Sequence, residues 1–190
     1  MKSLRTTLSV CALTATVAVA GFVGGVVLPQ ADQAEGATDT PSNCNYIPPT
    51  GTTTINWTNC FLGGINMSSA DLHGANLTRV RMAHSNLNWA NLANAKLIAA
   101  DMRDTDLVNT NLANSDLTGA ILSNARLISA SLSNSNLTNA KMNNTKLAGA
   151  DLKGANLTGV TGSPNFLGSS RSSTTTCPNG IRHGTSGADC

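Results

Sequence analysis

The most regular feature of the chain is a bulky aliphatic residue at every fifth position. Leu or Met recurs without a break from Leu62 to Leu157, twenty times in all. A step of five residues turns an α-helix by about 140° net, so these side chains would spiral round the axis and form no face. On a flat strand, an odd spacing sends successive side chains to opposite sides. The pattern therefore predicts a coil of short extended pieces that bends once every five residues.

The other positions of the repeat agree with such a coil. Two residues before each Leu or Met lies a small or β-branched residue, such as Ala70, Val80 or Thr105, which fits a narrow interior. Two residues after it, fourteen of the twenty positions are Gly, Asn or Asp. Because these residues adopt a positive φ at the least cost, we expect the corner of the coil at this position. The residues that flank the Leu are mostly polar and are expected to face water.

A longer period sets the number of repeats in one coil. Thr follows the Leu at only four positions, which lie 20 or 40 residues apart: Thr78, Thr118, Thr138 and Thr158. Charges also complement each other over 20 residues, as in Arg81 and Asp101. A coil of four repeats explains both observations.

The individual units resemble those of a known family. The units ADLHG, ANLTR and ADLKG, which begin at Ala70, Ala75 and Ala150, look like the A-[DN]-L-x-x motif of the pentapeptide-repeat family. The resemblance implies an all-β fold, a right-handed quadrilateral β-helix (β-solenoid) with four pentapeptide repeats per coil and about five coils. A basic or apolar residue replaces Asp or Asn before the Leu at several positions, among them Arg81, Lys96, Ile121, Arg126, Lys141 and Lys146. We expect these departures to alter surface charge and to leave the interior unchanged.

Flanking segments are predicted to close the ends of the coil, where apolar interior and strand edges would otherwise be exposed. The predicted organisation is a signal peptide at 1–34, an N-terminal cap or linker at 35–59, the β-helix at 60–160, and a C-terminal cap with a disulfide-closed tail at 161–190. Trp57 and Phe61 can cover the first coil, and Phe166 and Leu167 the last. The Ser/Thr run at 169–176 has the composition of a linker.

The N-terminus has the features of an export signal. Lys2 and Arg5 form a short positive region, and residues 8–28 carry no charge. Small residues suit a signal peptidase, and the candidate cleavage sites follow Ala20, Ala31 and Ala34. The alternative is a retained anchor, since about 21 uncharged residues can cross a bilayer. We expect a secreted or extracytoplasmic protein of the cell envelope, which would be membrane-anchored only if the signal were not cleaved.

Four cysteines remain once Cys11 leaves with the signal: Cys44, Cys60, Cys177 and Cys190. An even number in an exported chain indicates disulfides. Three pairings are possible, and proximity along the chain favours Cys44–Cys60 with Cys177–Cys190. Zinc is the alternative, but the sequence has no C-x-x-C and no two His residues at ligand spacing.

Charge and candidate chemistry point away from catalysis and nucleic acid. Only 12% of residues are charged, against about 25% in typical proteins, and no run of Lys or Arg suggests a nucleic-acid partner. The densest charge, at Asp101, Arg103, Asp104 and Asp106, is predicted to be a solvated salt-bridge face. It lacks a nucleophile, and a convex rod offers no concave pocket. We therefore predict no enzyme activity, no cofactor and no metal.

Two surface features are candidates for binding. Val108 and Ile128 should stack on one side of the coil, with Trp89 at the neighbouring corner, as a possible partner patch. The second feature is the Asn/Asp-x-Thr column, a possible ordered-surface ladder, whose ordinary alternative is a hydrogen-bonded side-chain ladder. Its residues are Thr78, Thr118, Thr138 and Thr158.

These observations favour a non-enzymatic exported structural or protein-interaction module, whose partner is another protein or a cell-envelope component. One alternative is a DNA mimic that inhibits or protects DNA gyrase, as some members of the resembled family do. The balance of Asp with Lys and Arg in residues 60–160, and the export signal, disfavour it. The other alternative is binding to ice or another ordered surface by the Asn/Asp-x-Thr face. The sequence leaves the ligand and the oligomeric state open.

Overall fold

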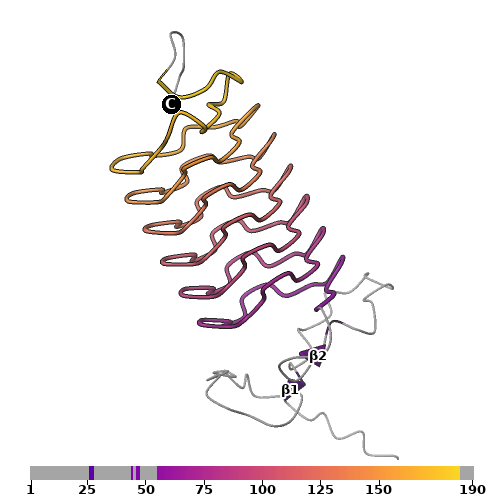
Figure 1. The fold of residues 1–190 in the computed structure, drawn as a ribbon. Helices are drawn as coiled ribbons and strands as arrows, with labels where there is room; N and C mark the ends of the chain where they lie inside the picture. The colour runs from indigo at the N-terminus through magenta and orange to yellow at the C-terminus, as the bar shows by residue number, and fades with distance from the viewer. Residues whose placement is uncertain (1–25, 28–43, 45, 48–54, 185–190) are drawn as a thin grey trace, which may run out of the picture.

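The computed structural model describes residues 26–27, 44, 46–47 and 55–184. Two short strands, β1 (Val26–Val27) and β2 (Tyr46–Ile47), form an antiparallel pair. β1 lies inside the predicted signal region, so cleavage after Ala20 would retain it, whereas the later cleavage sites would remove it. From residue 55 onward the chain winds into stacked coils (Figure 1). Among the residues that the structure describes, no helix has the length and apolar character that a membrane span requires.

Neighbouring coils are joined by single parallel β-bridges between residues 20 positions apart. On one side of the solenoid the bridged column runs through residues 56, 76, 96, 116, 136, 156 and 176. Within it, the Leu77 N–H donates to the Lys96 carbonyl at 2.7 Å, and the Lys96 N–H donates to the Ala75 carbonyl at 2.8 Å. Equivalent columns follow the other sides, which confirms the β-solenoid with four repeats per coil.

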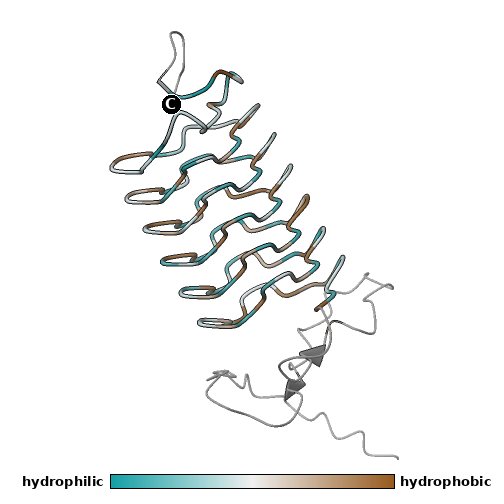
Figure 2. Ribbon diagram, in the orientation of Figure 1, coloured by the Kyte–Doolittle hydropathy of each residue, from teal (hydrophilic) through white to brown (hydrophobic). Residues whose placement is uncertain are grey.

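The interior of the solenoid is the predicted series of Leu and Met side chains. From Leu62 to Leu157, each of them is between 0% and 4% exposed. Hydrophobic and hydrophilic residues alternate along every coil, as expected where inward and outward positions alternate (Figure 2). Burying one Leu side chain contributes roughly 1.5–3 kcal/mol, so the stacked Leu and Met side chains are the main source of stability.

The small residues beside the Leu column also point inward, and some of them are polar. Ser85 Oγ donates to the carbonyl of Leu62, and Thr110 Oγ1 to that of Leu87, both at 2.8 Å and both one coil away. No buried side-chain nitrogen or oxygen in the described part of the chain lacks a hydrogen-bond partner. A hydroxyl is therefore tolerated inside this narrow core, because a carbonyl of the neighbouring coil accepts its proton.

The corners of the coil lie where the sequence predicts them. Every fifth residue from Asn59 to Gly159 has a positive φ, between 54° and 72°. Most corners are closed by a turn hydrogen bond, such as that from the Ala75 N–H to the Leu72 carbonyl at 3.0 Å. The preference for Gly, Asn and Asp at these positions follows from this left-handed conformation.

Asp and Asn before the Leu do more than face water. The side-chain oxygen of Asn136 accepts the N–H of Thr138 at 3.2 Å, and that of Asp151 accepts the N–H of Lys153 at 3.1 Å. Such contacts satisfy a backbone donor at the start of each corner. Replacement of Asn or Asp, as at Lys96, therefore removes a turn hydrogen bond as well as changing the surface charge. This role of the motif was not predicted from the sequence.

The solenoid extends beyond the predicted range of 60–160 at both ends. Trp57, 0% exposed, takes the place of a Leu one step before Leu62, and Asn56 bridges to Asn76. At the other end, bridges from Asp151 to Ser170 and onward show that residues 169–176 form part of a last coil, so their assignment as a linker was wrong. Neither extension carries Leu at the central position, which is why the periodicity did not reveal it.

Candidate functional site

Three of the predicted cysteines, Cys44, Cys60 and Cys177, lie at the ends of the solenoid. Cys44 and Cys60 form a disulfide, and Cys60 occupies a buried, inward position of the first coil. Cys177 is also disulfide-bonded and is buried in the place of a Leu. Cys190 lies outside the described residues. The disulfide at Cys60 ties the segment before the solenoid to its first coil.

The threonine ladder forms one side of the solenoid and is internally hydrogen-bonded. Thr118 Oγ1 donates to Asp116 Oδ1 at 2.5 Å, and Thr138 Oγ1 donates to Asn136 Oδ1 at 2.6 Å. Thr78 and Thr158 make the same bond to Asn76 and Asn156, at 2.8 Å and 2.7 Å. Between coils, Asn136 Nδ2 donates to Thr118 Oγ1 at 2.8 Å.

The ladder therefore has few donors left for a surface ligand. Each of these Thr hydroxyl protons is directed to the Asn or Asp two residues earlier, and Lys96 and Ile98 interrupt the array. This geometry fits the ordinary alternative, a ladder that joins the coils. Ordered-surface binding stays an untested prediction, and the hydrogen bonds do not favour it.

The apolar column lies on the opposite side of the solenoid from the threonine ladder. Val108, Ile128 and Ala148 occupy equivalent positions in successive coils and are partly buried. Leu167 takes the next position, because its carbonyl accepts the Gly149 N–H just as Ala148 accepts that of Ser129. Leu167 is 75% exposed. Its place in the column was missed, since the period shortens before it.

Trp89 stands at the corner beside this column. Its N–H donates to the carbonyl of Val108 at 3.0 Å, so the two residues lie in adjacent coils. Its side chain is 67% exposed, and its φ is 65°. The structure thus brings Trp89, Val108 and Ile128 to one edge of the solenoid. We use the name apolar edge for Trp89, Val108, Ile128, Ala148 and Leu167.

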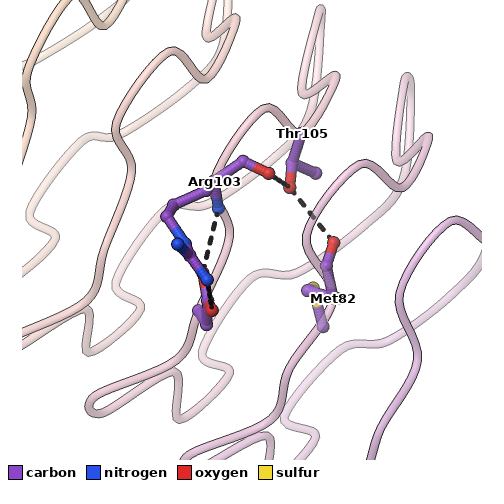
Figure 3. A network of polar contacts seen from close by, with 4 residues as sticks. Met82, Arg103 and Thr105 are labelled. Atoms are coloured by element: carbon purple, nitrogen blue, oxygen red, sulfur yellow. Dashed lines mark hydrogen bonds and ion pairs between the residues drawn. The ribbon is translucent and has the colours of Figure 1, made fainter. Parts of the chain in front are cut away.

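The charged cluster forms two separate ion pairs. Arg103 binds the Asp101 carboxylate through Nε at 2.8 Å and Nη2 at 2.7 Å, and Arg126 binds Asp106 at 2.8 Å. The hydrogen bond from Arg103 lowers the pKa of Asp101, although partial burial opposes the effect. Figure 3 shows Arg103 next to Thr105, whose Oγ1 lies between the carbonyl oxygens of Met82 and Arg103 at 3.2 and 3.3 Å.

Arg81 forms no salt bridge with Asp101, although their charges complement each other over 20 residues. Among the described residues it forms no ion pair, and its guanidinium lies over the ring of Phe61, 4.5 Å from the centroid. His73 Nδ1 lies 3.3 Å from the Ala93 carbonyl. No cluster of three or more potential metal ligands occurs in the described part of the chain.

The surface beside this cluster is concave, contrary to the prediction of a convex rod. An open groove of about 640 Å³ runs along the corner that precedes the Arg81 column. Its lining consists of Asn59, Phe61, Arg79, Arg81, Ala99, Asp101, Arg103 and Ile121. Long side chains on successive coils surround the small Ala99, and this difference in size makes the hollow. These residues fall in adjoining columns of period 20, but the period does not give the shape of the surface between their side chains.

A family comparison agrees with the repeat geometry. The model of pentapeptide repeats matches in eight copies, at residues 55–82, 85–124 and 120–159, which is more than half of the chain. The chain belongs to the pentapeptide repeat family. No protein with a curated description matches it significantly.

Solved structures of pentapeptide repeat proteins are similar to this one. A protein from the thylakoid lumen of Arabidopsis thaliana is 30% identical, with a TM-score of 0.53 over 67% of this chain and 86% of that chain. One from the cyanobacterium Cyanothece 51142 is 26% identical, with a TM-score of 0.25 over 63% and 88%. A plasmid-mediated fluoroquinolone resistance protein is 14% identical, with a TM-score of 0.28 over 63% and 85%. The similarity to the last two structures is too low to indicate a function.

Pentapeptide repeat proteins are generally non-catalytic. In a solenoid of this family the interior is filled by the repeat, so the differences between members lie in the outward columns and corners. In this pentapeptide repeat protein, the apolar edge and the arginine-lined groove lie at two diagonally opposite corners.

Proposed function

We propose that this pentapeptide repeat protein is a non-catalytic interaction module that works outside the cytoplasm and binds a partner protein or cell-envelope component through its apolar edge. A location outside the cytoplasm is supported by the Cys44–Cys60 disulfide, since disulfides persist in oxidising compartments. It is also supported by the predicted export signal, and a similar solved protein comes from a thylakoid lumen.

The observation that carries the binding role is the exposure of a large aromatic side chain, Trp89, at a corner of the solenoid. Its φ of 65° is positive, like that of the other corners of the regular coils, where Gly avoids the cost of about 1–2 kcal/mol that a residue with a side chain incurs. Burial does not offset this cost, because 67% of the residue is exposed. A large aromatic side chain at a strained corner thus contributes little to folding, and an advantage in binding explains its presence.

The neighbouring residues support the same role. Val108, Ile128, Ala148 and Leu167 place apolar side chains in four successive coils beside Trp89. Repeated β-layers about 4.8 Å apart make such a column straight and rigid. A rigid apolar column with an exposed aromatic anchor is the arrangement that protein interfaces use for their central contacts.

Capture of a partner tests the proposal. The purified exported chain is incubated with intact cells and with the cell-envelope fraction, and the bound material is compared between variants. We expect Trp89→Ser to reduce capture about tenfold or more, in the range of an aromatic hot spot. Ile98→Ser is the control, because Ile98 holds, on the opposite side of the solenoid, the position that Val108 holds beside Trp89: its carbonyl accepts the Arg79 N–H.

Two results would contradict the proposal. One is equal capture by the parent chain, Trp89→Ser and Ile98→Ser, or no captured partner at all. The other is a tagged protein that is found only inside the cell and has reduced cysteines. This result would exclude a location outside the cytoplasm. Retention by Ile98→Ser together with loss by Trp89→Ser assigns binding to the apolar edge.

A further inference from the structure

We infer that the arginine-lined groove is a second binding site, which takes a small organic anion: a carboxylate carried on an apolar body. The inference is independent of the proposed interaction function, because the groove lies at the corner diagonally opposite Trp89. Its lining includes Arg79, Arg81 and Arg103 beside Phe61 and Ala99.

The charge of the groove favours an anion. Arg79 and Arg81 form no ion pair among the described residues. Asp101 is the acidic residue of the lining, and its carboxylate is already bound by Arg103 through two hydrogen bonds. Arg81 also attracts the Asp101 carboxylate through space, but this one carboxylate faces three guanidinium groups, so the groove keeps an excess of positive charge. A guanidinium offers planar N–H donors that match a carboxylate.

Two of the three arginines are held in place before any ligand arrives. Arg81 lies on the face of Phe61, an attraction that leaves the N–H groups at its edge free to donate. Arg103 is fixed by Asp101 and uses two of its five N–H groups there. Preorganised donors lose less conformational entropy on binding, so they bind more tightly than the same donors on freely moving side chains.

The remaining lining selects against a bare inorganic ion. Phe61, Ala99 and Ile121 add apolar surface next to the guanidinium groups. A volume of about 640 Å³ falls in the range of about 300–1,000 Å³ that is typical of small-molecule sites. A ligand with an apolar ring or chain would bury this surface while its carboxylate meets Arg79 and Arg81.

Titration with three small probes tests the site on the folded exported chain. Benzoate has both the charge and the apolar body, benzamide has the shape without the charge, and acetate has the charge without the body. We expect benzoate to shift the backbone amide NMR signals of Arg81 and Asp101, with a dissociation constant on the order of 1 mM. Benzamide and acetate should bind about tenfold more weakly or not at all.

Substitutions of arginine show which residues bind benzoate. Arg79→Gln with Arg81→Gln should weaken benzoate binding about tenfold, since two of the three guanidinium groups are lost. Both residues are exposed, so the fold should survive. Arg126→Gln is the matched control, because this arginine lies on another side of the solenoid in its own ion pair. It should leave the benzoate titration unchanged.

Three outcomes would overturn the inference. Benzoate that shifts no signal of the groove shows that it is not a site for this class of ligand. Equal responses to benzoate and benzamide, or an equal loss in Arg126→Gln, remove the role of Arg79 and Arg81. A response to acetate or inorganic phosphate as strong as that to benzoate removes the role of the apolar body.

Discussion

The regular coils at 55–160 and the final coil at 161–177 are built on the same backbone pairing with very different side chains. In the regular coils the bridged residues are 20 apart, and each central position from Leu62 to Leu157 carries a buried Leu or Met. In the final coil the spacing shortens to 19, at the bridge from Lys146 to Asn165, and returns to 20 at the bridge from Asn156 to Thr176.

The residues of the final coil that stack on the Leu and Met series differ from it in kind. They are Gly162, Phe166, Arg171 and Cys177, and the Arg171 guanidinium lies over the Phe166 ring, 5.6 Å from its centroid. A further Leu layer would expose its apolar face at the end of the solenoid. Different residues instead cover the last Leu layer: Cys177 is buried, whereas Gly162, Phe166 and Arg171 are partly or fully exposed to water. Backbone pairing thus continues after the Leu repeat has stopped.

The largest effect on stability is expected when a buried side chain of the Leu and Met series is shortened. Leu117→Ala, in a fully buried layer, should lower the free energy of unfolding by about 2–5 kcal/mol, because it leaves a cavity that stacked coils cannot close. Phe166→Ala should lower it by only about 1–2 kcal/mol, since this side chain is partly buried. Denaturant unfolding, followed by circular dichroism, measures both.

The control for this pair is Leu167→Ala, which removes an exposed side chain of the same coil as Phe166. It should change the free energy of unfolding by less than about 0.5 kcal/mol. Equal losses for Leu117→Ala and Phe166→Ala would mean that the final coil belongs to the core and is not a cover.

A smaller effect is predicted at the corners. Corners of the regular coils include residues such as Ala99, whose φ is 54°, whereas the final coil turns at Gly162 and Gly168. Ala99→Gly should stabilise the protein by about 0.5 kcal/mol, because relief of the left-handed strain exceeds the entropy that Gly adds to the unfolded chain. Gly119→Ala, at the same corner one coil later, should destabilise it by about 1 kcal/mol.

Gly119 makes this a clean pair, because a Cβ added there meets no atom within 4 Å. Any loss of stability must then come from the backbone conformation. Thermal unfolding of the two variants gives the comparison. Changes of the same sign would show that φ does not govern the choice of residue at the corners.

The sequence was sufficient for the regular coils and insufficient at their borders. Leu62 to Leu157 predicts the solenoid because each step places one aliphatic side chain in a narrow interior, and no other regular element permits that spacing. Trp57 fills the same kind of position but is not aliphatic, so the pattern missed it. Residues 169–176 were missed because the shift of one residue at the final coil breaks the count.

The candidate sites show the same division. Trp89, Val108 and Ile128 could be placed together from the sequence, because their positions within a coil of 20 residues follow from arithmetic. Leu167 could not, since it lies beyond the break in the period. The groove depends on how far Arg79 and Arg81 extend around Ala99, and the period alone says nothing about the shape between side chains.

The smallest predicted effect on stability comes from the ion pairs, which also distinguish the regular coils from the final coil. Among the described residues, both ion pairs lie in the regular coils. Arg103 lowers the pKa of Asp101, so the pair contributes stability that is present above the unfolded-state value of about 3.9 and is lost as the pH falls through the lower folded-state pKa. The side chains are partly exposed and screened by solvent, so the contribution should be smaller than the effects at the corners.

Asp101→Asn should abolish this part of the acid dependence while leaving the rest of the unfolding curve unchanged. Arg103→Gln should have the same effect, because it removes the hydrogen bond that lowers the pKa, and the double variant should add nothing further. Thermal unfolding between about pH 2 and pH 6 measures the difference. If Asp101→Asn and the parent chain lose stability in parallel below about pH 4, then the ion pair does not stabilise the regular coils, and the Leu layers with their backbone ladder account for the difference from the final coil.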